Sequence, residues 1–156
     1  MRIHICAVGR LALRTPEAAL ISDYVMRADR TGRALALGPV TVHEVEAKKP
    51  GMPAEAEALR RVIPERATVV VLDERGHLLS SPDLALRIEG WRDAGAQDLA
   101  LVIGGADGTD PGLRDAAALT LSLGRMVWPH MLVRVMLAEQ IYRATSILAG
   151  GPYHRL

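Results

Sequence analysis

Two short runs of the sequence consist almost entirely of apolar residues, ATVVVL at 67–72 and LALVI at 99–103. Neither run alternates with polar residues, as a strand with one solvent-facing side would. Unbroken runs of this kind are typical of strands covered on both faces, which occur mainly in parallel sheets flanked by helices. The two runs therefore predict an α/β fold with a mostly parallel sheet.

The rest of the chain alternates strands with helices and contains no internal repeat or linker, so we expect a single domain over residues 1–156. Thr15 and Ser81 are expected to cap two of the helices, because each directly precedes a proline that suits a first helical turn. A breaker-rich loop is expected at 47–53. The further strands are expected at 3–8, 40–46 and 125–127, and the helices at 16–30, 54–63, 82–94, 113–121 and 129–148.

Composition excludes several classes of function. The lone cysteine, Cys6, allows no internal disulfide, and the five histidines lack ligand-like spacing, so we expect no metal. No apolar run approaches the roughly 20 residues of a membrane helix, which favours a cytoplasmic protein without a membrane segment. A nucleotide-binding regulatory domain is disfavoured, since GxGxxG is absent and Lys48 and Lys49 are the only lysines.

Three loops follow expected strands, at 72–77, 104–108 and 122–130. Ligands of open α/β sheets bind beyond the carboxyl ends of the strands, so the site is expected among these loops. Gly104-Gly105 would let the backbone approach a ligand closely, although a tight turn explains the pair equally well. Asp73 and Glu74 could act as a base or simply pair with nearby N–H groups and Arg75.

The segment Pro152-Tyr153-His154-Arg155-Leu156 is unusual for a tail, because it combines side chains that stack, carry charge and titrate near neutral pH. It either forms part of the active site or packs on its own sheet. The preceding helix is apolar on several faces, so it is either central to the fold or packed against a second copy of the chain. Its terminal position favours the second alternative, and we expect a homodimer. Its polar residues cluster on one side and are Glu139, Gln140, Arg143 and Ser146.

Five motifs occur in order, and together they resemble the RlmH family of ribosomal RNA large-subunit methyltransferases over the whole chain. The motifs are CAVGR at 6–10, VVLDERGHLLSSPDLA at 70–85, LVIGGADG at 101–108, SLGRMVWPHMLVRVMLAEQIYRA at 122–144 and PYHR at 152–155. The resemblance implies a SPOUT-type fold, in which helices cover a mostly parallel sheet and the C-terminal segment forms a trefoil knot. It also implies a homodimer that binds S-adenosylmethionine and methylates N3 of a pseudouridine in helix 69 of 23S rRNA, within the assembled 70S ribosome.

The resemblance also assigns site residues. Tyr153, His154 and Arg155 match family positions for substrate handling and catalysis. The cofactor-binding positions are Leu72, Gly104, Gly105, Arg125, Met126, Val127, Trp128, Pro129 and His130. The chain departs from common family residues at His77, Ala106-Asp107, Gly124, Val127 and Leu156. Val127 lacks a hydroxyl that could contact the cofactor, so we expect affinity to change more than function.

An imide nitrogen attacks only after losing its proton, and His154 is the expected proton acceptor because imidazole titrates near the working pH. Tyr153 is expected to stack on the flipped base, and Arg155 to hold an RNA phosphate or to stabilise the developing imidate. Arg10, Arg14, Lys48 and Lys49 could grip ribosomal RNA or could be solvated surface charges. The alternatives are a SPOUT methyltransferase acting on another RNA such as tRNA, and a non-catalytic ribosome-binding factor of the same fold.

Overall fold

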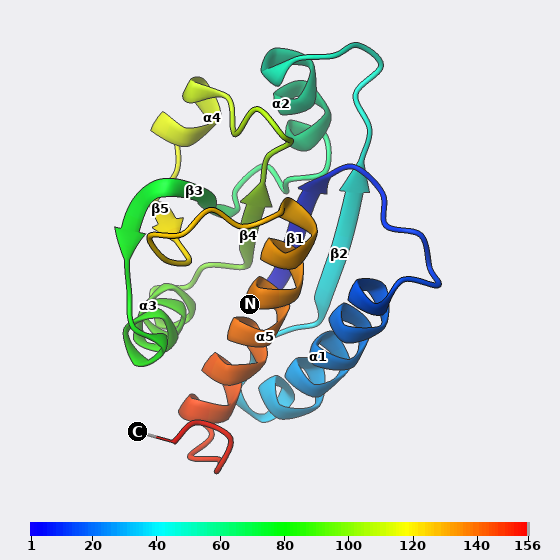
Figure 1. Cartoon of the computed structure of the whole chain (residues 1–156). Coiled ribbons are helices and arrows are strands. Elements are labelled where there is room, and N and C mark those ends of the chain that lie inside the picture. Colours follow the sequence, from blue (N-terminus) through cyan, green and yellow to red (C-terminus); the bar gives the residue numbers. More distant parts are fainter. Residues whose placement is uncertain (156) are drawn as a thin grey trace.

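A five-stranded parallel sheet forms the centre of the structure, a computed structural model that describes residues 1–155. Leu156, the last residue of the tail that we singled out in the sequence, lies outside the described residues. The strands are β1 (Arg2–Val8), β2 (Val40–Val45), β3 (Thr68–Leu78), β4 (Asp98–Ile103) and β5 (Leu119–Ser122), in the sheet order β2-β1-β4-β3-β5 (Figure 1). The helices are α1 (Pro16–Gly32), α2 (Met52–Arg60), α3 (Ser81–Asp93), α4 (Pro111–Asp115) and α5 (His130–Leu148), with a 3-10 turn, η1, at Arg33–Leu35.

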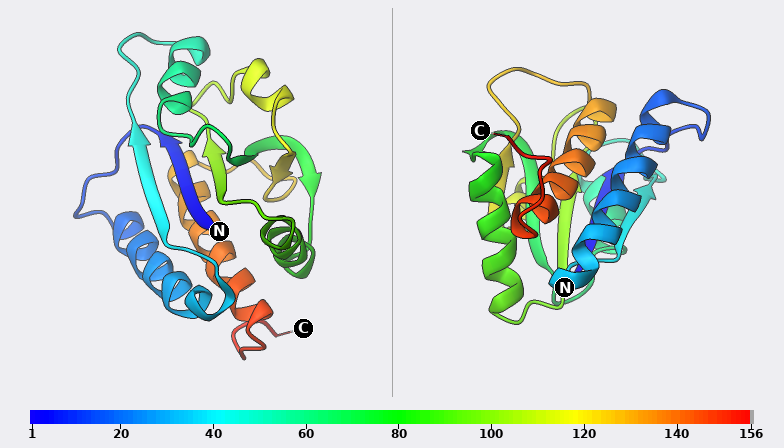
Figure 2. Two further views of the ribbon diagram at one scale, coloured as in Figure 1. Left: turned by 180° about the vertical axis from the view of Figure 1, so that it is seen from behind. Right: turned by 90° about the horizontal axis from the view of Figure 1, so that it is seen from below.

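Helices cover both faces of this sheet, as the two apolar runs predicted. Alternate residues along each central strand enter two separate clusters. In β4, Leu99 and Leu101 face α1, α3 and α5, whereas Ala100 and Val102 face α2 and α4. All six residues of β4 are buried. Figure 2 shows α1, α3 and α5 side by side on one face of the sheet.

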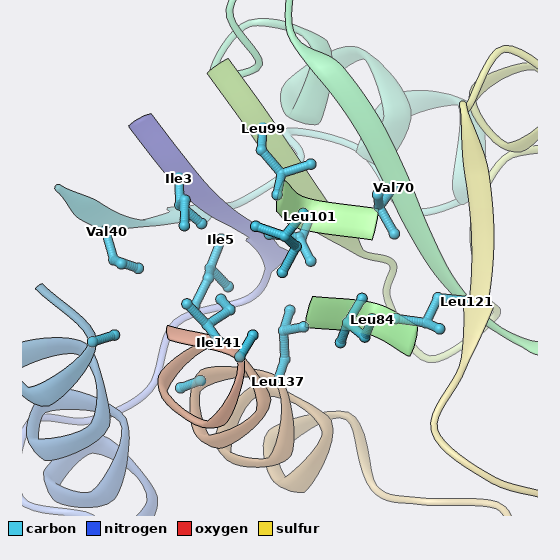
Figure 3. Packing of buried hydrophobic residues seen from close by; sticks show 14 of the residues in the cluster. Ile3, Ile5, Val40, Val70, Leu84, Leu99, Leu101, Leu121, Leu137 and Ile141 are labelled. Carbon is cyan, nitrogen blue, oxygen red and sulfur yellow. The ribbon is translucent and has the colours of Figure 1, made fainter. Parts of the chain in front are cut away.

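Helix α5 fills the middle of the larger layer. Its Leu137 and Ile141 lie against side chains of β1 and β4 in the packing view (Figure 3). Because α5 packs between α1 and α3, its apolar residues on several sides serve the core of this chain. Of the two interpretations of the apolar pattern, a central position in the fold is therefore confirmed, and the exposed apolar side chains of the helix lie near its start.

The region before α5 differs from the expectation. The strand expected at 125–127 is not formed, and the helix expected over 113–121 ends at Asp115. Residues 119–122 instead form β5, which pairs with β3 after Ala118 N–H donates to the carbonyl of Val69 at 2.9 Å. The pairing partner is about 50 residues distant in the sequence, so no local signal encodes this strand.

Two smaller boundaries also shift. Thr15 caps α1 as expected, but the cap of α3 is Ser80 rather than Ser81, because Ser80 Oγ accepts from the N–H of Asp83. Strand β3 continues past its apolar run to Leu78. Its pairing with β5 shifts between Leu72 and His77, both of which lie opposite Leu121, and residues 73–76 form a bulge.

Candidate active site

A cleft of about 500 Å³ opens at the carboxyl ends of β3, β4 and β5, beside the start of α5. This is the edge of the sheet where the sequence placed the site, and the volume is typical of a small-molecule pocket. Apolar walls come from Leu72, Ile103, Leu121 and Trp128. The cleft therefore suits a ligand with a flat or apolar part that also makes polar contacts with backbone.

One wall of the cleft is glycine backbone at 104–108. A Cβ on Gly104 would lie 2.5 Å from the carbonyl oxygen of Gly108 and 2.6 Å from Thr109 Oγ1. A Cβ on Gly105 would lie 2.6 Å from both carboxylate oxygens of Glu55. The turn is closed by the Gly108 N–H, which donates to the Gly105 carbonyl at 3.1 Å. The tight turn is therefore confirmed, and both glycines line the cleft.

The bulge at 73–76 forms the facing wall and carries most of the charge. The N–H of Arg75 donates to Asp73 Oδ1 at 2.9 Å, and Arg114 contacts Asp73 Oδ2 at 3.4 Å. Asp73 is thus a loop carboxylate with two partners, as one of the two interpretations of this pair stated. With Glu74 and Asp107, it lines the cleft with three carboxylates against the two arginines, Arg75 and Arg114.

The loop 122–130 closes the cleft above β5. Ser122 Oγ donates to the Gly124 carbonyl at 2.8 Å, which holds the chain in a turn where Gly124 has a φ of 134°. A residue with a side chain adopts that φ only under strain, so the glycine belongs to this loop geometry. Val127 is 81% exposed, and the side chain that lacks the hydroxyl therefore points largely to solvent.

The structure brings most of the expected cofactor residues together. Arg125 and Pro129 do not line the cleft; Pro129 instead begins α5, where its carbonyl accepts from Leu132 and Val133. The expected residues that do line the cleft are Leu72, Gly104, Gly105, Met126, Val127, Trp128 and His130.

The tail lies elsewhere, folded back along α5 (Figure 1). Tyr153 O–H donates to Glu139 Oε1 at 3.0 Å, and its ring centroid lies 4.5 Å from that of Tyr142. His154 Nδ1 lies 3.2 Å from Arg143 Nη1. None of the described tail residues, 152–155, lines the cleft, so one chain does not join its tail to its own cleft.

The surroundings of the tail change the pKa of Tyr153. Burial, followed by hydrogen bonding to Tyr24 and Glu139, raises the pKa of Tyr153 well above its usual value. Its phenol therefore stays protonated at neutral pH and acts as a hydrogen-bond donor. The Arg143 guanidinium lies 4.7 Å from the centre of its ring and holds the ring in place.

Two groups of contacts escaped the sequence interpretation. Arg143 and Glu139 were predicted only as part of a polar helix face, and no role was predicted for Arg134. Arg134 is fully buried, with Nη1 donating to Glu44 at 3.0 Å and Nη2 donating to the Val8 carbonyl. Arg134 is a charged residue within an apolar stretch of helix, and a charge buried in such a stretch needs a partner. This pattern could have predicted an ion pair for Arg134.

The chain matches the family model described as "Predicted SPOUT methyltransferase" over residues 1–154. It is 67% identical to a ribosomal RNA large subunit methyltransferase H from Paracoccus denitrificans over 99% of both chains. It is 61% identical to the protein of that name from Ruegeria sp. over 100% of both chains. The chain belongs to the RlmH family of SPOUT methyltransferases.

SPOUT methyltransferases take their methyl group from S-adenosylmethionine. The cleft fits that molecule in the chemistry of its walls. Apolar side chains and glycine backbone suit an adenine ring, and the three carboxylates balance a ligand that carries positive charge. None of the helices among residues 1–155 is both long and apolar enough to cross a membrane. Within the same residues, histidine, cysteine and carboxylate side chains form no group suited to a metal ion.

Proposed function

We propose that this protein methylates N3 of a pseudouridine in helix 69 of 23S rRNA, on the assembled ribosome in the cytoplasm. The observation that carries the proposal is full-length identity of 61–67% to relatives named ribosomal RNA large subunit methyltransferase H. The cleft supports the proposal, because the cleft lies at the carboxyl ends of the strands and is lined by most of the residues that the resemblance assigned to the cofactor.

We assign cofactor binding to the cleft and to backbone rather than to charged side chains. S-adenosylmethionine supplies a methyl group on a positively charged sulfur, which becomes neutral on transfer. Leu72, Trp128 and the glycines at 104 and 105 would hold and orient it, together with Met126, Val127 and His130. Because the positive charge is lost, the site gains most from positioning of the reacting atoms. The carboxylate of Asp73 would add electrostatic attraction before transfer.

We further propose that the active unit is a homodimer in which one tail serves the partner's cleft. Large apolar side chains are exposed around the start of α5, where a monomer would leave them in water. They are Met126, Val127, Trp128, Met131 and Leu132. A two-fold pairing across this surface would supply the tail that one chain does not bring to its own cleft. The trefoil knot that the resemblance implies for the C-terminal segment is part of the same proposal.

The tail would provide the catalytic groups. Tyr153 would stack on the flipped base, and Arg155, which is exposed, would hold a phosphate. His154 would contact the reacting pyrimidine. The imide proton must leave N3 before the nitrogen attacks, and negative charge then spreads over N3 and the two carbonyl oxygens of the ring.

Purified ribosomes from a strain lacking the gene, incubated with the protein and labelled cofactor, test the proposal. We expect one methyl group on the helix 69 pseudouridine, found by mass spectrometry, and no labelling of tRNA. Labelling of tRNA instead would favour the other RNA substrate. Calorimetric titration without detectable cofactor binding would favour a non-catalytic ribosome-binding factor.

The tail assignment has its own test. Replacing His154→Ala should lower turnover by about a hundredfold or more while the cofactor affinity stays within about twofold, because His154 is assigned to the pyrimidine rather than to the cofactor. Turnover is measured by methyl transfer to ribosomes and affinity by calorimetry. Equal losses in turnover and affinity would contradict the separation of roles.

A further inference from the structure

The contact between Arg143 and His154 determines which ring nitrogen of the histidine carries the proton. Arg143 Nη1 lies 3.2 Å from His154 Nδ1. A guanidinium has five N–H donors and no acceptor, so Nδ1 must offer its lone pair. In a neutral imidazole the proton is then on Nε2.

Arg143 is held in place for this task by the carboxylate of Glu139. Its Nε donates to Glu139 Oε1 at 3.0 Å, and Nη2 donates to the same oxygen. This leaves Nη1 directed at the histidine. The hydrogen bond to Glu139 also raises the pKa of Arg143, so the guanidinium keeps its charge. One carboxylate thus orients both Arg143 and the phenol of Tyr153.

The other ring nitrogen has no partner. His154 Nε2 is buried and makes no hydrogen bond within residues 1–155. A buried donor without an acceptor costs about 1–3 kcal/mol. An acceptor that reaches Nε2 while Nδ1 stays on Arg143 would therefore lower the free energy of the docked tail.

We propose that Arg143 is a positioning residue that fixes His154 as the Nε2–H tautomer, so that this histidine donates a hydrogen bond to a pyrimidine carbonyl of the substrate. The inference rests on the proposed function for the identity of the acceptor. A carbonyl oxygen that gains negative charge as N3 loses its proton is the acceptor that such a donor stabilises most. The N3 proton leaves to water, and the nitrogen keeps the electron pair that forms the bond to the methyl carbon.

This role differs from the proton acceptor expected from the sequence. Accepting the N3 proton at Nε2 would require the ring to move its own proton to Nδ1, which faces Arg143. The donor role needs no such exchange. The two roles also predict different replacements for His154, because the glutamine amide can donate a hydrogen bond but cannot take up a proton near neutral pH.

The tautomer is measured directly by NMR of the full-length protein labelled with ¹⁵N at histidine, in mildly alkaline buffer where imidazoles are neutral. His154 is assigned from the signal lost in His154→Gln. We expect a protonated Nε2 and an unprotonated Nδ1 in the wild-type protein. We expect a mixture of tautomers in Arg143→Met and a return toward the wild-type signal in Arg143→Lys, which restores a charged donor.

Arg27→Met is the matched control, since Arg27 also lies against the aromatic cluster, 5.9 Å from the ring of Tyr142, and hydrogen-bonds Asp23 rather than His154. It should leave the tautomer and the turnover unchanged. A protonated Nδ1 in the wild-type protein, or an unchanged His154 signal in Arg143→Met, would overturn the proposal. These spectra require no substrate, so they give an answer even if ribosomes prove not to be the substrate.

Methyl transfer to ribosomes then tests the consequence. Arg143→Met should lower kcat about ten- to a hundredfold, the range for loss of one hydrogen bond to a charged group, with KM for S-adenosylmethionine nearly unchanged. His154→Gln should retain at least tenfold more activity than His154→Ala. A His154→Gln variant as inactive as His154→Ala would support a proton acceptor and overturn the donor role.

Discussion

Helix α5 contains two arginines, Arg134 and Arg143, whose side chains have different surroundings. Arg134, near the start of the helix, is 1% exposed, and it reaches Glu44 and the Val8 carbonyl at the ends of two strands. Arg143, nine residues later, is 24% exposed, and its partners are Glu139 on the same helix and His154 in the tail. Burial lowers the pKa of Arg134, whereas the hydrogen bond to Glu139 raises that of Arg143.

This difference indicates that Arg134 stabilises the fold, whereas Arg143 positions a residue of the proposed site. Arg134 connects three elements that are far apart in the sequence, and the helix start that it holds lines the cleft. Arg143 connects only a helix and the segment that follows it. Its loss should leave the sheet and its helices intact while it frees the tail. The same residue type in one helix thus has two roles, which stability and turnover should distinguish.

The largest effect is expected from Arg134→Met. It leaves Glu44, which is 29% exposed, without its buried cation, and it leaves the Val8 carbonyl without this donor, so the free energy of unfolding should fall by about 3 kcal/mol. Arg143→Met should lower it by about 1 kcal/mol or less, because its partner lies one turn away on the same helix. Urea denaturation followed by circular dichroism measures both.

Turnover completes this comparison. Arg143→Met should lose turnover at a temperature where it is fully folded, and Arg134→Met should lose stability first. Similar losses of stability in the two variants would show that Arg143 also holds the fold together. Such similar losses would mean that Arg134 and Arg143 do not differ in their roles.

The parts of the fold that local patterns encode were predicted from the sequence, and the parts that depend on distant pairing were not. The buried strands at 67–72 and 99–103 and the cap at Thr15 follow from residue type and spacing. The strand β5 does not, because Leu119 and Leu121 acquire their conformation only by pairing with β3. The edge that carries the cleft was predictable from the parallel sheet. The Arg143–His154 contact was not, since it requires the tail to fold back on α5.

The buried carboxylate of Asp98, remote from α5, pairs with Arg2, whose side chain is 60% exposed, and provides a second ion pair for comparison. Asp98 bonds Arg2 at 2.7 Å and His4 at 2.8 Å at the amino ends of β1 and β4. The hydrogen bonds from Arg2, with those from His4, lower the pKa of Asp98 to about 2. A lowered folded-state pKa means that its stabilisation is present above about pH 4 and is lost as the pH falls toward about 2.

Asp98→Asn should therefore cost about 2 kcal/mol at neutral pH and less in acid, where the wild-type carboxyl is itself protonated. Urea denaturation of both proteins across the acid range gives the two curves. Methyl transfer should not change, because Asp98 lies at the opposite end of the sheet from the cleft. A constant difference between the curves at every pH would argue against the ion pair.

A smaller effect than that of Asp98→Asn concerns the cleft, whose glycine wall tests whether backbone rather than side chains binds the cofactor. In Gly104→Ala, the new Cβ would lie 2.5 Å from the Gly108 carbonyl and would push the turn open or into the cleft. Affinity for S-adenosylmethionine, measured by calorimetry, should fall about tenfold, which is about 1.4 kcal/mol. Gly90→Ala in α3 is the control, because its Cβ meets nothing within 4 Å and alanine favours helix. Neither Gly104→Ala nor Gly90→Ala should alter the tail, so the His154 tautomer should stay as in the wild-type protein. A Gly104→Ala variant with unchanged affinity would mean that side chains of the cleft, and Asp73 first among them, bind the cofactor instead.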